Sequence, residues 1–181
     1  MLLKNNMTIK EELLADIRVF KAPDLAKHIL ATSQLNELVT LGLEKDHLLS
    51  SRAMWVLSHC SDIDSNCVKP YYSKLILNLK HKNLPDGVIR STLRLFQDNE
   101  VPSKHQALVL DTCYTYIKNP LKAIAIRSFA ITVVYQLSKP YPELLNELKM
   151  VLLHVSTHPD SPGMNSKIKN TLKLIDKYNR K

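Results

Sequence analysis

Three side chains near residue 156 have the chemistry of a metal site. His154 and His158 have the i, i+4 spacing of a metal-binding pair on a helix, and Asp160 follows them. Pro159 interrupts the helix at this point, however, and no carboxylate lies between the histidines as it does in a zinc-protease helix. Histidine also suits the C-terminal end of a helix, where it meets the negative end of the helix dipole. We therefore expect a capping role here and not a metal site.

A second candidate metal site consists of His59, Cys60 and Cys67. The six-residue gap between the two cysteines is not a zinc-finger spacing, and no fourth ligand follows. A cysteine near the end of a helix is more often a small buried apolar residue. We therefore expect neither a metal nor a cofactor in this protein.

Motifs for nucleophilic catalysis and for phosphate binding are missing from the sequence. The chain has no Gly-x-Ser-x-Gly elbow, and its three glycines are too few for a glycine-rich phosphate loop. The paired carboxylates, such as Glu143 with Glu147, are expected to lie on solvated helix faces. The sequence thus favours a non-catalytic protein.

One segment resembles part of an enzyme superfamily. Residues 161–170, SPGMNSKIKN, are similar to the serine-rich signature loop of the fumarase, aspartase and adenylosuccinate lyase superfamily. The similarity consists of Ser161, Met164 and Lys167 in that order, whereas Asn165 stands where that superfamily has proline and Lys169 where it has asparagine. The resemblance implies a lyase-related protein, which is a remote alternative.

The cysteines and the apolar segments indicate a cytoplasmic protein. Three cysteines are an odd number in a chain of 181 residues, which is long enough to build its own core, so they do not indicate a disulfide framework. The N-terminal segment has no apolar stretch long enough for a secretory signal. The most apolar segment, 121–137, is interrupted by Lys122 and Arg127, so we expect no membrane span.

The positive charge is concentrated at the C-terminal end of the chain. The net charge is +8, and the last 17 residues hold six basic side chains against one aspartate. A basic terminal helix is most simply a solubilising end cap. The alternative is a contact with nucleic acid or with an acidic partner. Its candidate residues are Lys167, Lys169, Lys173, Lys177 and Arg180.

Prolines and apolar spacing divide the chain into medium-length helices. From Pro70 onward the main steps between prolines are 15 to 20 residues, which suits one helix plus a short loop, and proline is favoured in the first turn of a helix. Thr8 with Glu11 and Ser103 with Gln106 fit capping boxes. The predicted helices span residues 8–21, 24–31, 34–43, 47–60, 67–82, 85–98, 102–118, 121–138, 141–156 and 164–179.

A repeat of about 40 residues underlies these helices. Arg52, Arg90, Arg127 and Lys169 align at spacings of 38, 37 and 42 residues, and isoleucine precedes the last three of them. This period with two helices per unit is typical of stacked helical hairpins. The segment 126–137, IRSFAITVVYQL, resembles the HEAT/armadillo class of helical repeats, which implies a protein-binding surface.

The repeat predicts an all-α protein with one domain, 1–181. We expect an α-α superhelix, a right-handed HEAT/armadillo-like stack of four to five helical hairpins, because a single hairpin cannot bury its own apolar face. The helix at 121–138 is apolar nearly all round, so we expect it inside the stack. The repeat units are predicted at 8–43, 47–82, 85–118 and 121–156, followed by a capping helix at 164–179 with Ile168, Leu172 and Ile175 inward and its lysines outward.

The predicted function is a non-catalytic scaffold that binds a protein or peptide along a concave face. The second helix of each pair would line this face, and tyrosines there would act as contact anchors. The main alternative is a nucleic-acid-binding protein that uses basic residues of the C-terminal half, and homo-oligomerisation stays open. The predicted contact residues are Tyr71, Lys74, Asn78, His105, Thr112, Tyr116, Asn146 and Lys149.

Overall fold

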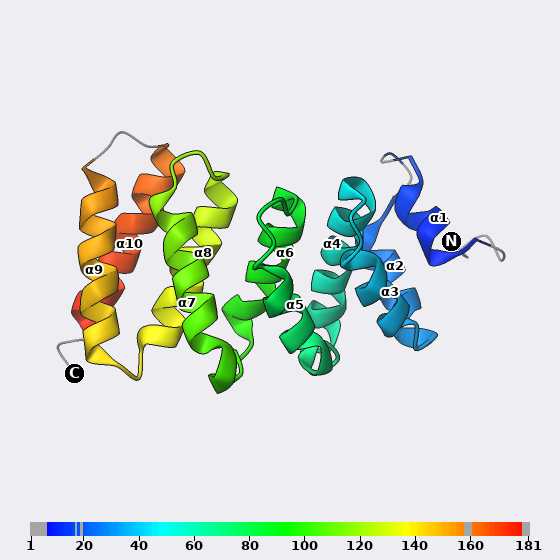
Figure 1. The fold of residues 1–181 in the computed structure, drawn as a ribbon, viewed down its shortest axis with the longest axis horizontal. Coiled ribbons are helices and arrows are strands. Elements are labelled where there is room, and N and C mark those ends of the chain that lie inside the picture. Colours follow the sequence, from blue (N-terminus) through cyan, green and yellow to red (C-terminus); the bar gives the residue numbers. More distant parts are fainter. Residues whose placement is uncertain (1–6, 17, 19, 158–160, 179–181) are drawn as a thin grey trace. The chain divides into compact units, whose positions relative to one another are not determined.

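The computed structural model describes residues 7–16, 18, 20–157 and 161–178, and all regular secondary structure in these ranges is helical (Figure 1). The chain forms two compact units, Met1–Leu95 and Phe96–Lys181, and the boundary between them falls inside helix α6. The helices are α1 (Ile9–Leu14), α2 (Ala22–Ala31), α3 (Leu35–Gly42), α4 (His47–Ile63), the 3-10 helix η1 (Lys69–Tyr71), α5 (Tyr72–Asn78), α6 (Asp86–Asp98), α7 (Ser103–Lys118), α8 (Ile124–Ser138), α9 (Pro142–Ser156) and α10 (Pro162–Tyr178).

Two predicted helices are shorter than expected. The helix predicted at 8–21 ends at Leu14. The Arg52 side chain donates hydrogen bonds to the carbonyl oxygens of Leu13 and Ala15, which would accept backbone N–H groups if the helix continued. The helix predicted at 67–82 is divided into η1 and α5, and α5 ends in i to i−3 backbone bonds such as that from Leu79 N–H to the carbonyl of Ile76. Such bonds tighten the last turn of a helix, so the chain leaves the helical path early.

One of the two predicted capping boxes forms. Thr8 accepts a hydrogen bond from the N–H of Glu11 at 3.2 Å, and the Glu11 carboxylate accepts one from the N–H of Thr8 at 2.8 Å. The second prediction is wrong, because Ser103 is already the first residue of α7 and Pro102 is its N-cap. Gln106 instead donates from Nε2 to the carbonyl oxygen of Val101 at 3.1 Å.

Helix α4 is the centre of the core in unit 1. It packs against α1, α2 and α3, and α2 also contacts α3. Ala53, Met54 and Leu57 on α4 are fully buried, as are Ile29 on α2 and Leu38 on α3. Alternating small and large side chains let these helices approach closely and fill the space between them.

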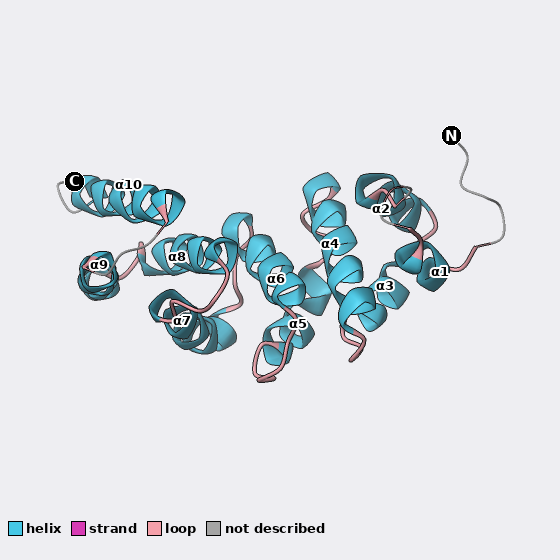
Figure 2. Ribbon diagram, turned by 90° about the horizontal axis from the view of Figure 1, so that it is seen from above, coloured by secondary structure: helices cyan, strands magenta, loops and turns pink. Residues whose placement is uncertain are grey.

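Helix α8 is the centre of the core in unit 2, as the apolar sequence of this segment predicts. It packs against α7, α9 and α10, which surround it in Figure 2. Ala130, Ile131 and Val134 are fully buried there. Leu121 departs from the prediction, because α8 begins only at Ile124 and the Leu121 side chain is 92% exposed in the preceding loop.

The final helix α10 buries one side against α8 and α9. Ile168 and Ile175 are buried as predicted, together with Met164 and Thr171, whereas Leu172, also predicted to face inward, is only half-buried. Lys167 corrects the prediction that the lysines point outward: its Nζ donates to Thr132 Oγ1 on α8 at 2.7 Å. Burial of this half-buried amine lowers its pKa.

Candidate functional site

The predicted contact residues of unit 1 lie on η1 and α5. Lys74 is exposed, whereas Tyr71 and Asn78 are half-buried. The buried neighbours Tyr72 and Leu75 hold this short segment against the core, so that the intervening positions reach solvent. These three side chains are thus available for a polar contact.

The predicted contact residues on α7 are less accessible. Tyr116 is only 8% exposed, and the Lys122 amine lies 5.8 Å from the centre of its ring. Thr112 donates from Oγ1 to the carbonyl oxygen of Leu108 in its own helix at 2.8 Å. The expectation of an exposed tyrosine anchor at Tyr116 is therefore wrong, and His105 is half-buried.

The predicted contact residues on α9 have different surroundings. Asn146 is exposed, whereas Lys149 donates from Nζ to Asp176 Oδ1 at 2.7 Å and so joins α9 to α10. An amine engaged in an ion pair between two helices has less freedom to contact a partner. Lys149 therefore serves first as a tie between these two helices.

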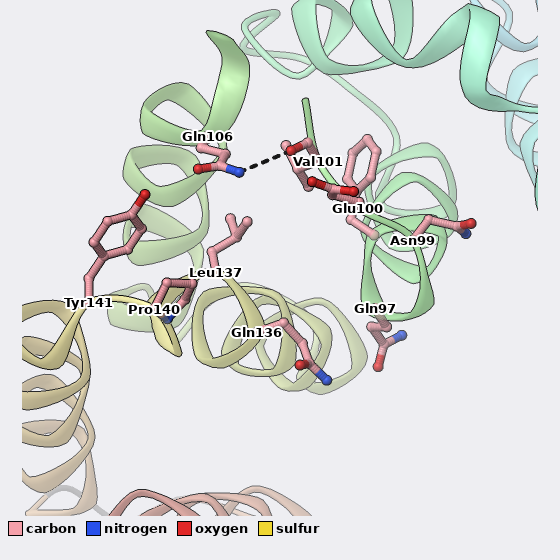
Figure 3. Close-up of a pocket in the computed structure, with 10 residues that line it drawn as sticks. Gln97, Asn99, Glu100, Val101, Gln106, Gln136, Leu137, Pro140 and Tyr141 are labelled. Atoms are coloured by element: carbon pink, nitrogen blue, oxygen red, sulfur yellow. Dashed lines mark hydrogen bonds between the residues drawn. The ribbon is translucent and has the colours of Figure 1, made fainter. Parts of the chain in front are cut away.

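A pocket of about 510 Å³ lies between the C-terminal end of α6, the loop after it, α7 and α8 (Figure 3). Its volume is within the usual range of ligand pockets, about 300–1,000 Å³. The pocket opens to solvent on the surface of unit 2. Its lining residues are Phe96, Gln97, Asn99, Glu100, Val101, Gln106, Gln136, Leu137, Pro140 and Tyr141.

Most polar side chains of the pocket are uncharged. Gln106 uses its Nε2 for Val101, as the dashed line in Figure 3 marks, which leaves its Oε1 as an acceptor. Gln136 accepts a hydrogen bond from Lys139 Nζ through Oε1, which leaves its Nε2 as a donor. The pocket therefore presents both donors and acceptors, with Glu100 as the single carboxylate of its lining.

This pocket was not predicted from the sequence. Its polar residues come from a stretch at 97–106 and from 136 and 141, and none is among the predicted contact residues. A clue was the polar run QDNE at 97–100, which lies between two amphipathic helical segments. The grouping of these side chains depends on how α7 and α8 pack, which spacing along the chain does not reveal.

Of the two cysteines in the second candidate metal site, Cys60 is buried and Cys67 is half-buried. Burial raises the pKa of Cys60 to about 12 and that of Cys67 to about 11, and both thiols are free. His59 contacts Asp62 through Nδ1 at 3.3 Å. In the part of the chain that the structure describes, no three His, Cys, Asp or Glu side chains cluster as a metal site would require, and His158 and Asp160 lie outside that part.

The residues of the lyase-like segment have structural roles. Ser161 accepts a hydrogen bond from the N–H of Met164 at 3.2 Å at the start of α10. Met164 is fully buried, and Lys167 bonds to Thr132. Each of the three matching residues therefore makes a packing or hydrogen-bonding contact within the fold.

The basic residues of α10 divide into two groups. Lys169, Lys173 and Lys177 are exposed, whereas Lys167 points toward α8, so it is corrected from a surface contact to a residue that packs against α8. Arg180 lies outside the described residues. Among the described residues, α10 thus presents three exposed lysines from the predicted basic set.

The paired helices of both units define the class of this chain, which is a helical-repeat protein. The HEAT repeat domain family matches residues 9–175, and the chain belongs to this family. No curated protein and no solved structure matches the chain significantly. Across the described residues, every helix is too short or too polar to cross a lipid bilayer.

Proposed function

We propose that this protein is a non-catalytic HEAT-repeat scaffold, and that the pocket of unit 2 binds a short extended segment of a partner protein. The observation that supports this proposal is the pocket lining, which combines four side-chain carboxamides and one tyrosine with apolar side chains. The carboxamides are those of Gln97, Asn99, Gln106 and Gln136.

Carboxamide side chains suit a peptide backbone. Each backbone unit of an extended peptide presents one N–H donor and one C=O acceptor, and a carboxamide can serve both. Gln106 offers an acceptor and Gln136 a donor, because their other atoms are already engaged. Leu137 and Pro140 also line the pocket, so an apolar side chain of the bound segment can be buried against them.

The pocket supports a peptide better than a nucleic acid or a reaction. Phosphate groups require Lys or Arg, and the lining contains neither. General acid–base catalysis needs two groups of matched pKa, whereas Glu100 is the lone carboxylate of the lining. The predicted contact residues Tyr71, Lys74 and Asn78 in unit 1 form a separate proposed surface.

The proposal is tested with a random twelve-residue peptide library displayed on phage and selected on the full chain. We expect selected peptides to be uncharged near their centre and to bind the wild-type protein. The double variant Gln106→Ala/Tyr141→Ala should weaken their binding by about tenfold or more, because each lost hydrogen bond and contact contributes about 1 kcal/mol. Fluorescence anisotropy of labelled synthetic peptides measures the affinity.

The matched control is Asn170→Ala, which removes an exposed carboxamide from α10, away from the pocket. This change should leave peptide affinity unaltered. Selected peptides that bind the double variant as well as the wild type would refute the pocket proposal. Binding of random-sequence duplex DNA with a steep salt dependence, and no peptide selected, would favour the nucleic-acid alternative.

We also propose that the protein works in the cytoplasm. Cys60, Cys67 and Cys113 are free thiols, and Cys60 and Cys113 are buried. Thiols of this kind persist in a reducing compartment. Fluorescence microscopy of a tagged protein in its native cell checks this location.

A further inference from the structure

An open groove lies between α9 and α10 in unit 2, separate from the pocket near α6. It has a volume of about 610 Å³. Ser156 and Thr157 line it at the end of α9, and Leu172, Lys169 and Lys173 line it from α10. The proposed peptide pocket shares no lining residue with this groove, so each can bind its own ligand.

Helical spacing places two exposed apolar side chains of α9, Met150 and Leu153, beside the residues that line the groove. The helices α9 and α10 run antiparallel (Figure 1), and the ion pair between Lys149 and Asp176 sets their register. Leu153 lies one turn after Lys149 and Leu172 one turn before Asp176, so these two leucines are level with each other. Leu153 is 43% exposed and Met150, on the same side of α9, is 67% exposed. Exposed apolar groups along a groove mark an interaction site.

The charge of the groove is positive. Lys169 and Lys173 are exposed one helical turn apart, and no ion pair with either is present among the described residues. The one carboxylate of the lining, Asp176, is already neutralised by Lys149. The groove thus combines an apolar strip with two lysines at i, i+4 spacing.

We propose that this groove binds an acidic amphipathic helix of a partner protein. The apolar face of that helix packs on Leu153, Leu172 and Met150, and its carboxylates meet Lys169 and Lys173. A third helix fits the furrow between two antiparallel helices, because ridges of side chains pack into such grooves. The i, i+4 spacing of the lysines matches glutamates at the same spacing on a helix.

The apolar strip favours a protein over a nucleic acid. Nucleic-acid phosphates would use the two lysines but would leave Met150 and Leu153 in contact with water. Two phosphate contacts also give only weak, strongly salt-dependent binding. An acidic amphipathic helix uses both features of the groove at once.

The test uses two synthetic sixteen-residue peptides and the full chain. Both peptides carry leucine on one helical face, and the other face is glutamate in one peptide and lysine in the other. Fluorescence anisotropy should give an affinity for the glutamate peptide about tenfold or more above that for the lysine peptide. The variant Lys169→Glu/Lys173→Glu should reverse this preference, a result that a merely misfolded variant cannot produce.

The matched control is Lys80→Glu/Lys82→Glu, which changes the net charge equally at exposed positions that follow α5. It should leave the preference for the glutamate peptide intact. Leu153→Ser should lower the affinity for the glutamate peptide by about fivefold or more, because an apolar contact is lost. Equal affinities for the two peptides would overturn the proposal. It would also be overturned if the Lys169→Glu/Lys173→Glu variant lost binding to a labelled DNA duplex but bound both peptides as the wild type does.

Discussion

Arg52 on α4 holds the C-terminal end of α1 by donating from Nη1 to the carbonyl oxygen of Leu13 at 2.8 Å. The same nitrogen donates to the carbonyl oxygen of Ala15 at 2.6 Å, and the guanidinium lies 5.0 Å from the centre of the Phe20 ring. The last carbonyl groups of a helix have no partner within that helix. Arg52 therefore stabilises the end of α1 from a position 39 residues further along the chain.

Arg127 repeats this relationship in unit 2. Its side chain is buried on α8, and Nε donates to the carbonyl oxygen of Ile117 in the last turn of α7 at 3.3 Å. Arg52 and Arg127 occupy aligned positions of the repeat, whereas the aligned Arg90 is exposed. At two of the four aligned positions, the basic side chain thus donates hydrogen bonds to carbonyl oxygens at the C-terminal end of an earlier helix.

We predict that Arg52→Met lowers the free energy of unfolding by about 1–3 kcal/mol, because it leaves two carbonyl groups without a charged donor. The loss should appear first as faster hydrogen exchange of the amides of α1. Urea denaturation followed by circular dichroism measures the overall change. Arg90→Met is the control, with an expected effect within about 0.5 kcal/mol. Equal effects of the two substitutions would contradict this role of Arg52.

We predict that Gly87→Ala destabilises the protein by about 1–3 kcal/mol through a steric clash. A Cβ atom at Gly87, in the first turn of α6, would lie 2.7 Å from both Cβ and Oγ of Ser51 on α4. Ser51→Gly removes these atoms, so the double variant should recover part of the loss. Thermal denaturation of the two single variants and the double variant gives the coupling energy.

Gly163 supplies the matched control for Gly87. It lies in the first turn of α10, and a Cβ atom there would meet nothing within 4 Å. Gly163→Ala should therefore stabilise the protein by about 0.4–1 kcal/mol, because alanine loses less backbone entropy on folding. Destabilisation by Gly163→Ala as large as that by Gly87→Ala would show that the close approach of α4 and α6 is not the cause.

We predict that stability falls as the pH rises above 9 and that Cys60 contributes to this fall. Burial raises the pKa of Cys60 from 9.0 to about 12. Above pH 9 the unfolded chain releases the thiol proton while the native protein retains it. The folding equilibrium constant therefore falls as the pH rises from 9 toward 12. Cys60 contributes a decrease of up to about tenfold per pH unit.

Urea denaturation between pH 8 and 11 in the presence of a reductant measures this effect. Cys60→Ala should give a shallower decline than the wild type, whatever its stability at pH 8. Ser58→Ala is the control, since Ser58 is equally buried on α4 but does not titrate in this range. Its curve should run parallel to that of the wild type, and a parallel curve for Cys60→Ala would refute the prediction.

The positions of the helices along the chain were largely predictable because the sequence signals for them are local. Apolar residues at helical spacing and prolines in first turns, such as Pro142 and Pro162, determine where helices form without help from distant residues. The capping box at Thr8 was predictable for the same reason, since both partners lie within one turn. The box at Ser103 failed because Pro102, which has no backbone N–H to donate, occupies the N-cap position and Ser103 is already inside the helix.

The surface was less predictable because exposure depends on what packs against a helix. Spacing along α10 places Lys167 on its outer face, but contact with α8 turns its amine toward Thr132. Tyr116 lies on a predicted contact face, yet it is almost wholly buried. The partner of Lys167 lies 35 residues away along the chain, beyond the reach of helical spacing.

The amino-acid sequence by itself determined that this chain folds as stacked helical pairs of about 40 residues. The period of apolar residues and the placement of prolines act over one or two turns, and they require no knowledge of the partner helices. Only the tertiary structure decided which polar groups meet, as in the pocket near Gln106 and Gln136 and in the groove beside Leu153. Those surfaces arise where helices pack, and the free energy of packing depends on side chains that lie far apart along the chain.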